Sequence, residues 1–211
     1  MKLNLKWTFF LTLMVTGLFS HGHAAAQQSS QQSPPNPTAF IEKVANDTFE
    51  QIKQLRKKGE IAPKDLENII EQYLLPHVDH IYTGLLVLGS SANSSEKSDI
   101  QAYLDIFKLY LSSTYAASLN YYNDQQVLFE PLRDFQNKDK VSINAHVKEK
   151  GKPDVQMQFK LRLDKSGQWK AYDLVVEGIS LVQSKRSEFA PLLRQKGLPG
   201  LTQTLKQKVE S

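Results

Sequence analysis

The chain has 211 residues, of which 40% are hydrophobic, and a formal net charge of +4 at pH 7. This length suits one domain with a single core. Because the 26 basic residues are scattered among 22 acidic ones, nucleic-acid binding is not expected. The absence of cysteine excludes disulfide bonds, thiol catalysis, a cysteine-bound metal and a lipid-modified cysteine.

Residues 1–26 have the three parts of a secretory signal peptide. Lys2 and Lys6 precede the apolar run Trp7–Phe19, and Ala24–Ala26 forms a small-residue cleavage site. We predict export to the periplasm and cleavage near Ala26, which removes two lysines and leaves a charge of about +2. An uncleaved membrane anchor is the alternative, but the apolar run is shorter than the ~20 residues of a membrane-spanning helix.

The next segment, Gln27–Pro37, reads QQSSQQSPPNP and is predicted to be a disordered leader because it is polar and rich in proline. One domain is expected over residues 38–211. Its first helix is predicted from Thr38 to a cationic last turn at Lys57 and Lys58. The apolar residues of this helix recur at three- and four-residue spacing: Phe40, Ile41, Val44, Phe49, Ile52 and Leu55.

Two shorter helices are expected next, one from Pro63 to Leu74 and one within His77–Gly89. Ser90–Ser98 is rich in serine and is predicted to be a loop. Within this loop, Asn93 and Glu96 have the spacing of a capping box for the helix that follows.

The longest apolar stripe predicts a helix of more than six turns within residues 100–122. Three tyrosines lie on this face, and each brings a flat apolar ring with a hydroxyl that needs a partner. Such a face is typical of ordinary core and also of a pocket that is partly wet near its mouth. The stripe consists of Ile100, Tyr103, Leu104, Phe107, Leu111, Tyr115, Leu119 and Tyr122.

After Asn123 the hydrophobic period changes from 3.6 to 2, which predicts antiparallel strands joined by hairpins. A short strand is expected at Val127–Phe129, with Pro131 indicating a sheet edge or an early end of the strand. Clean alternation predicts strands at Val141–Val147 and Val155–Leu163.

The Trp169–Val176 strand ends in the consecutive apolar residues Leu174, Val175 and Val176, so both of its faces are expected to be covered. A bend at Glu177–Gly178 is predicted to carry Ile179–Val182 across the rim of a pocket, as the element that moves when a ligand enters. Helices then return to the end of the chain. Helices, then a meander of strands, then helices argue for an α+β fold with helices on one face of a curved antiparallel sheet.

Two groups of polar residues are candidates for chemistry. His77, Asp79 and His80 are the nearest approach to a metal site, but a solvated cluster at a helix start is the more common meaning of this pattern. Asp173 and Glu177 flank an apolar run and form a candidate acid–base pair. A structural role is the alternative, with Asp173 accepting hydrogen bonds and Glu177 at the bend. No metal site and no catalytic residue is predicted.

Four stretches in order resemble the MlaC family of periplasmic phospholipid carriers, also called toluene-tolerance or Tgt-type proteins. YDLVVEGISLVQSKRSEF (Tyr172–Phe189) follows Trp169 and is similar to the family signature. The other three are LLPHVDHIYTGLLVLG (74–89), FKLYLSSTYAASL (107–119) and LLRQKGLPGLTQTL (192–205). The resemblance extends from about residue 38 to residue 207.

The resemblance implies a curved sheet related to the NTF2-like fold, with an apolar pocket that takes the acyl chains of a phospholipid. It implies a monomeric carrier without cofactor, whose cargo moves between the outer and inner membranes to maintain outer-membrane lipid asymmetry. The implied partners are an inner-membrane ABC transporter with an MCE-domain subunit and an outer-membrane lipoprotein–porin complex.

The predicted lipid-binding residues come from the helices and from the sheet, and plain core packing is the alternative for each. Two further functions remain open: an enzyme on the same fold that uses Asp173 or Glu177, and a lipid-free adaptor that binds envelope proteins. The predicted lining residues are Tyr82, Leu86, Phe107, Leu111, Tyr115, Val155, Met157, Phe159, Leu174, Val176, Ile179 and Leu181.

Overall fold

The computed structural model describes residues 35–210. The predicted signal peptide and residues 27–34 of the predicted leader lie outside the described residues. Pro35 and Asn36 already belong to the domain, because the indole Nε1 of Trp169 donates a hydrogen bond of 2.7 Å to the Pro35 carbonyl. Asn36 caps the first helix by accepting hydrogen bonds from the N–H groups of Thr38 and Ala39.

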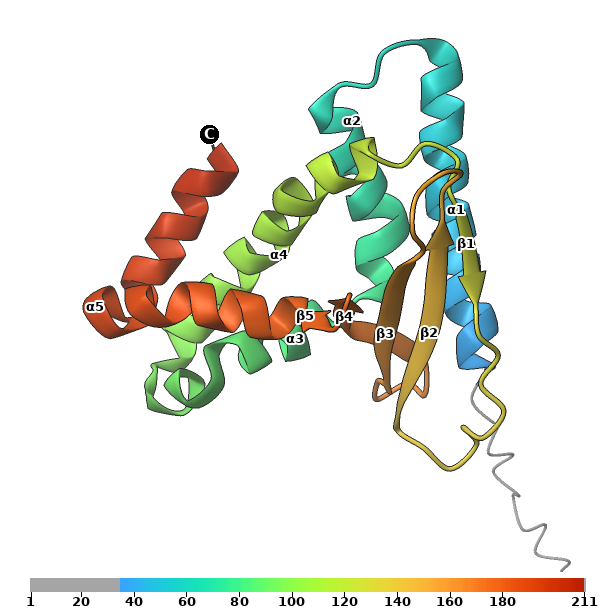
Figure 1. The fold of residues 1–211 in the computed structure, drawn as a ribbon. Helices are drawn as coiled ribbons and strands as arrows, with labels where there is room; N and C mark the ends of the chain where they lie inside the picture. The colour runs from blue at the N-terminus through green and yellow to red at the C-terminus, as the bar shows by residue number, and fades with distance from the viewer. Residues whose placement is uncertain (1–34, 211) are drawn as a thin grey trace, which may run out of the picture. The chain divides into compact units, whose positions relative to one another are not determined.

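Helices precede the sheet in the chain (Figure 1). The Thr48 hydroxyl bonds to the Val44 carbonyl and so keeps a polar side chain buried inside the first helix. Pro63 begins the second helix as its first residue. The helical elements are α1 (Pro37–Lys58), α2 (Pro63–Ile69), the π-helical η1 (Ile70–Leu74), the 3₁₀ turns η2 (Leu75–His77) and η3 (Gly89–Ser94), α3 (His80–Leu88) and α4 (Lys97–Asn120).

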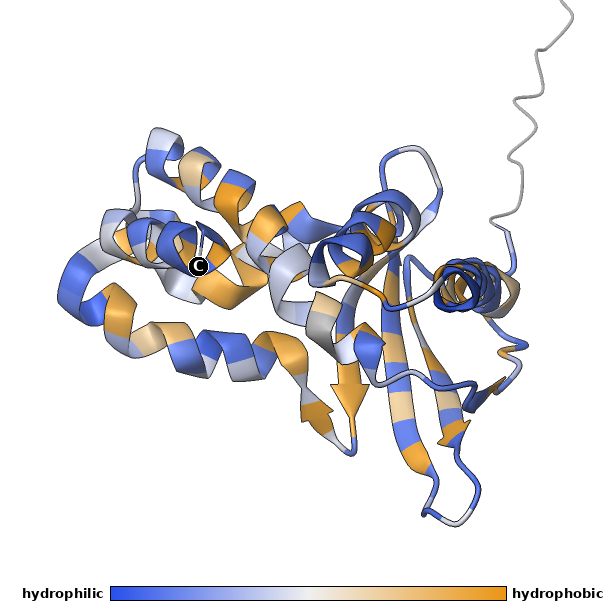
Figure 2. Ribbon diagram, turned by 90° about the horizontal axis from the view of Figure 1, so that it is seen from above, coloured by the Kyte–Doolittle hydropathy of each residue, from blue (hydrophilic) through white to orange (hydrophobic). Residues whose placement is uncertain are grey.

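The sheet has five antiparallel strands in the order β1-β2-β3-β4-β5, with β1 at one edge as predicted from Pro131. Hydrophobic and hydrophilic residues alternate along β2 and β3 (Figure 2). Because side chains alternate across a strand, one face of the sheet is apolar. The α+β class with a curved, open antiparallel sheet is confirmed. The strands are β1 (Gln126–Phe129), β2 (Lys140–Lys148), β3 (Val155–Leu163), β4 (Trp169–Val176) and β5 (Ile179–Ser180).

Three apolar clusters hold the helices and the sheet. One joins α3, α4 and α5 (Leu181–Glu210), with Tyr103 and Phe107 fully buried. A second packs α1 against α2 and α4 around Ile52. The third packs Trp169 and the inner face of β2 and β3 against α1. At ~25 cal/mol per Å² of apolar surface, these clusters supply the main stabilisation of a chain without disulfides.

The bend after β4 is a two-residue turn made by Glu177 and Gly178, with φ values of 49° and 79°. Both residues therefore occupy the left-handed region, as the tight hairpin between β4 and β5 requires. Ser180 then caps α5, because its hydroxyl oxygen accepts a hydrogen bond of 3.1 Å from the N–H of Gln183. Within α5, Gly197 adopts φ 65° and divides the helix into two parts.

The predicted capping box at Asn93 and Glu96 is wrong. The α4 helix starts at Lys97 with Glu96 in the N-cap position, and no side chain caps it. The serine-rich segment before it forms the 3₁₀ turns of η3 instead of an open loop, and the Ser95 hydroxyl bonds to the Ser91 carbonyl at 2.8 Å. A shift of the helix start by a few residues is enough to remove the reciprocal bonds of a capping box.

Candidate functional site: an apolar cavity between sheet and helices

A cavity of about 560 Å³ lies between the inner face of the sheet and the helices. This volume is in the range of sites that hold a small organic ligand. The lining residues are mostly apolar and come from every layer. Helix α1 and the turns after α2 contribute Ile41, Val44, Ala45, Thr48, Phe49, Ile70, Leu74, Leu75, His77 and Val78; α3 and α4 contribute Thr83, Val87, Phe107, Leu111, Tyr115, Ser118 and Leu119; the sheet contributes Val127, Phe129, Val147, Val155, Met157, Phe159, Ala171, Tyr172, Asp173 and Leu174; α5 contributes Leu181, Val182 and Lys185; and the segments after α4 and β2 contribute Tyr121, Tyr122, Gln125, Glu149, Lys152 and Pro153.

The sheet wall follows from the period of two residues along β3. Val155, Met157 and Phe159 point to the same face because successive side chains alternate across a strand. Phe159 lies opposite Leu174 of β4 in the register of the two strands, so the wall continues across the sheet. Val155 is 37% exposed and lies at the outer end of this wall.

The helical wall follows from a period of four residues along α4. Phe107, Leu111, Tyr115 and Leu119 are each four residues apart, so they lie above one another on one face of the helix. Phe107 is fully buried, whereas Tyr121 near the end of the lining is 82% exposed. The cavity therefore runs from the core towards solvent at the end of α4.

Few polar groups face this cavity. Burial raises the pKa of Tyr115, whose hydroxyl stays neutral at physiological pH. Asp173 is buried but fully engaged: its carboxylate accepts hydrogen bonds from Ser180 Oγ at 2.7 Å and from the Val182 N–H at 3.1 Å. It also forms an ion pair of 3.1 Å with Lys160.

Eight of the twelve residues predicted as lipid-binding line this cavity together. They come from α4, β3, β4 and the start of α5, which the structure brings together around one cavity. Whether they contact lipid stays a prediction. The eight are Phe107, Leu111, Tyr115, Val155, Met157, Phe159, Leu174 and Leu181.

The other four predicted residues lie outside the lining. Leu86 is half-buried and packs against the cluster of α3, α4 and α5. Val176 is half-buried at the end of β4, where it pairs with Ile179 of β5. Ile179 itself is 63% exposed.

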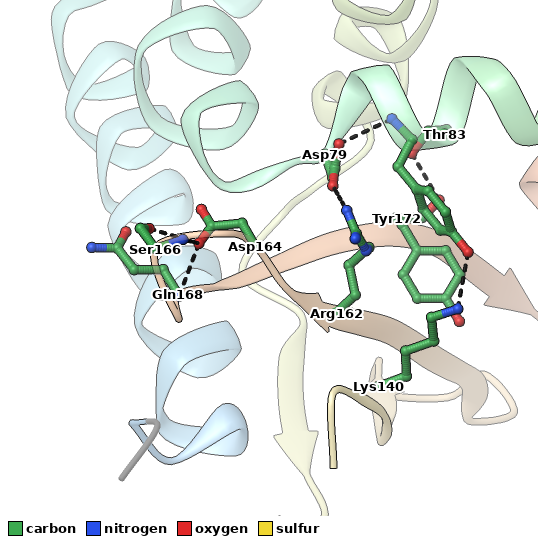
Figure 3. A network of polar contacts seen from close by, with 9 residues as sticks. Asp79, Thr83, Lys140, Arg162, Asp164, Ser166, Gln168 and Tyr172 are labelled. Carbon is green, nitrogen blue, oxygen red and sulfur yellow. Dashed lines mark hydrogen bonds and ion pairs between the residues drawn. The ribbon is translucent and has the colours of Figure 1, made fainter. Parts of the chain in front are cut away.

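A polar network lies between α3 and the sheet (Figure 3), and Tyr82 belongs to it through its contacts with Asp79 and Lys140. Its hydroxyl accepts a hydrogen bond of 3.0 Å from Lys140 Nζ, and the Arg162 guanidinium lies 4.4 Å from the centre of its ring. Arg162 also forms an ion pair with Asp79, which caps α3 through the N–H of Tyr82. The Thr83 hydroxyl donates to the Tyr172 carbonyl at 2.9 Å, so the network fixes α3 on β4.

The structure adds a wall that the sequence interpretation left out. Helix α1 contributes Val44, Thr48 and Phe49 to the lining, together with Val127 and Phe129 of β1. The apolar period of α1 was visible in the sequence, but nothing in that period distinguishes a cavity wall from core.

The candidate metal residues do not form a site. Asp79 serves as the α3 cap and the partner of Arg162. Among the described residues, no three His, Cys, Asp or Glu side chains are arranged to hold a metal ion. His77 and His80 are partly buried, and desolvation lowers the pKa of both, with Lys170 and Lys108 adding to the effect.

Asp173 and Glu177 have separate surroundings. Glu177 is exposed in the turn after β4, and its carboxylate accepts a hydrogen bond from the Gln156 N–H. Both carboxylates therefore have structural partners, as the alternative to an acid–base pair required. Asp173 accepts a backbone hydrogen bond from Val182 and forms its ion pair with Lys160.

A second cleft, of about 340 Å³, lies outside the apolar cavity near the start of α3. Its lining mixes both signs of charge, including Glu71, His80, Lys108 and Asp164.

Within residues 35–210, no helix combines the length and the hydrophobicity needed to cross a bilayer.

Three comparisons with known proteins agree on the relationship of this chain. The model of the MlaC protein family matches residues 42–207. The intermembrane phospholipid transport system binding protein MlaC of Haemophilus influenzae is 26% identical over 204 residues, which cover 96% of this chain and 92% of the relative. The phospholipid-binding protein from Ralstonia solanacearum, solved in complex with a phospholipid, has the same fold: the TM-score is 0.73 at 22% identity, over 83% of this chain and 97% of that one. Because the family match covers most of the sequence, the chain belongs to the MlaC family.

Proposed function

We propose that this protein is a phospholipid carrier that moves its cargo between the inner and outer membranes and so maintains outer-membrane lipid asymmetry. The observation that carries the proposal is the apolar cavity between the sheet, α1 and α4. The names of the relatives support it, since one is a binding protein of an intermembrane phospholipid transport system and another was solved with a phospholipid.

The physical task of such a carrier is to keep acyl chains out of water. A diacyl lipid exposes several hundred Å² of apolar surface, and shielding it at ~25 cal/mol per Å² contributes roughly 10 kcal/mol before ordering costs. The wall of Met157, Phe159 and Leu111 supplies the apolar surface for this exchange. Binding of this strength leads to slow spontaneous release, so we expect a partner to open the cavity.

The proposed setting is the periplasm, reached after cleavage of the predicted signal peptide near Ala26. The proposed partners are an inner-membrane ABC transporter with an MCE-domain subunit and an outer-membrane lipoprotein–porin complex. The system named for the Haemophilus influenzae relative supports a place between two membranes.

The proposed function includes no catalysis. The strongest catalytic candidate was Asp173. Its carboxylate accepts hydrogen bonds from Ser180 and Val182, which join β4 to β5 and α5, and forms an ion pair with Lys160 of β3. Because these contacts join two elements of the fold, we assign Asp173 a structural role.

Organic extraction of the protein purified from its exported form tests the proposal. We expect about one phospholipid or more per protein, identified by mass spectrometry of the extract. A protein that is fully folded and carries no lipid, and that takes none from phospholipid vesicles, would support the adaptor. Turnover of a small soluble substrate by lipid-free protein would support the enzyme.

A further inference from the structure

Two lysines occur among the described residues that line the apolar cavity, and their surroundings differ. Lys152 lies in the turn between β2 and β3, with 65% of its side chain exposed, and pairs with Glu149 at 2.7 Å. Lys185 lies in the second turn of α5, and only 18% of its side chain is exposed. Lys185 thus places a cationic group at the boundary of the apolar cavity.

Hydrogen bonds hold the Lys185 ammonium group in place. Its Nζ donates to the Tyr110 hydroxyl at 2.9 Å and to Glu188 Oε2 at 2.7 Å. Tyr110 is itself buried and packs beside Phe189. An ammonium group has three N–H donors, so these two bonds leave one for a ligand.

The charge of this group is not fully balanced by Glu188. The same carboxylate also accepts a hydrogen bond of 3.3 Å from Lys208 Nζ, so two ammonium groups share Glu188. Burial lowers the pKa of Lys185, but its bonds with Glu188 and Tyr110 outweigh burial and raise this pKa overall. Lys185 is therefore charged at neutral pH.

Asp173 and the first turn of α5, which also lie at this part of the cavity, already have partners. Asp173, the nearest acidic group of the lining, is neutralised by Lys160 and bonded to Ser180. The first N–H groups of α5 that could hold an anion donate to Asp173 and to Ser180 instead. Lys185, in contrast, keeps one N–H donor that can bind an anion.

We propose that Lys185 binds the phosphate group of the cargo and makes the cavity select phosphate-bearing diacyl lipids over neutral ones. This inference rests on the proposed carrier function. The apolar walls are expected to contribute equally to the binding of phosphatidylglycerol and diacylglycerol when the two lipids have the same acyl chains. A charge-assisted hydrogen bond to the phosphate is available to phosphatidylglycerol alone.

The test is a competition between these two lipids. The purified mature protein is incubated with micelles that contain equimolar chain-deuterated dioleoylphosphatidylglycerol and dioleoylglycerol, and the bound labelled lipids are quantified by mass spectrometry. We expect the wild type to favour phosphatidylglycerol. Loss of one charge-assisted bond predicts that Lys185→Met lowers the ratio about ten- to a hundredfold.

Three variants make the result specific. Lys185→Arg keeps the charge and retains most of the preference, whereas Lys185→Gln loses it and serves as a second neutral variant if the methionine destabilises the fold. Lys152→Met is the matched control, because it removes the other lysine of the lining, and it keeps the wild-type ratio. If Lys185 binds the phosphate of the lipid, inorganic phosphate added to the wild type leaves the ratio of bound phosphatidylglycerol to diacylglycerol unchanged.

Each other outcome decides against the inference. Equal uptake of both lipids by the wild type, or a wild-type ratio in both neutral variants, would overturn the role of Lys185 and leave the carrier function intact. A ratio abolished by inorganic phosphate would assign the site to a free anion. Uptake of neither lipid by the wild type would contradict the carrier function itself.

Discussion

Asp173 on β4 accepts a hydrogen bond of 3.1 Å from the backbone N–H of Val182, so the sheet directly supports the first turn of α5. The same carboxylate binds Ser180 of the short β5 strand. The sheet wall of the cavity and the wall formed by Leu181 and Val182 are thereby joined through one buried side chain.

Replacement of Asp173 by alanine is expected to destabilise the protein by about 2–4 kcal/mol, because it leaves a polar backbone group and the partly buried Lys160 without their acceptor. Urea unfolding followed by circular dichroism measures the change. Asp154→Ala is the control: Asp154 pairs with Lys148 at 3.4 Å on the surface, where an ion pair contributes about 1 kcal/mol or less. Equal effects of the two substitutions would contradict the structural role of Asp173.

Met157 and Gln158 are neighbours on β3 that face opposite sides of the sheet. Met157 lines the cavity, whereas Gln158 bonds to Asn144 at 3.0 Å on the outer face. We expect Met157→Glu to lose most bound lipid, because a carboxylate in the apolar wall is costly to desolvate. Gln158→Glu, which adds the same charge, should retain its lipid. The measurement is lipid per protein after extraction, with thermal melts to verify folding; full loading of Met157→Glu would remove this residue from the site.

Gly84 allows α3 and α4 to approach closely. A Cβ at this position would lie 2.6 Å from Leu104 Cδ2 and 3.1 Å from Phe107 Cδ1, both of them buried. Gly84→Ala is therefore expected to destabilise the fold by about 1–3 kcal/mol despite the better helix propensity of alanine. In a Leu104→Ala background the same substitution should cost less, since the clashing methyl group is gone. Additive free energies of unfolding in this double-mutant cycle would show that the two side chains do not meet.

His77 and His80 predict a loss of stability on mild acidification. Desolvation lowers the pKa of both in the folded state, so the unfolded state binds more protons between the folded pKa and the ordinary value of about 6.5. The free energy of unfolding should therefore fall as the pH is lowered from about 7 to about 5. The double variant His77→Gln/His80→Gln should show a shallower dependence in urea titrations across this range. An unchanged slope would mean that neither imidazole resists protonation.

Periodicity alone predicted the elements whose two faces differ strongly. The alternation of Val155, Met157 and Phe159 fixed their common face, and the four-residue spacing of Phe107, Leu111 and Tyr115 did the same for α4. Both sets line one cavity. Two apolar faces that turn towards each other are both removed from water.

The rotation of helix α3 about its axis could not be predicted from periodicity. Its sequence is apolar on nearly every side, so its rotation is not encoded in the pattern. Tyr82 and Leu86 were predicted to face the cavity, but Thr83 and Val87, one position further, line it. The rotation is set by the contacts of Tyr82 with Lys140 and Arg162, which are distant in sequence.

The predicted motion of Ile179–Val182 stays a prediction. Two features of the structure affect this segment in opposite ways. The left-handed turn at Glu177 and Gly178 begins it, and the hydrogen bond from the Val182 N–H to Asp173 anchors it to the sheet. The anchor joins Asp173 to residues seven and nine positions further along the chain. No local pattern indicates these contacts, so the sequence predicted the turn but not its restraint.

The proposed carrier function requires that acyl chains occupy the cavity between the sheet, α1 and α4. A phospholipid with a photoactivatable diazirine near the end of one acyl chain, loaded into the purified protein and irradiated, labels the residues that surround the chain. We expect labelled peptides from β3 and α4, at positions such as Met157, Phe159 and Leu111. Labelling confined to the outer face of the sheet, or to the charged cleft near His80 and Lys108, would contradict it.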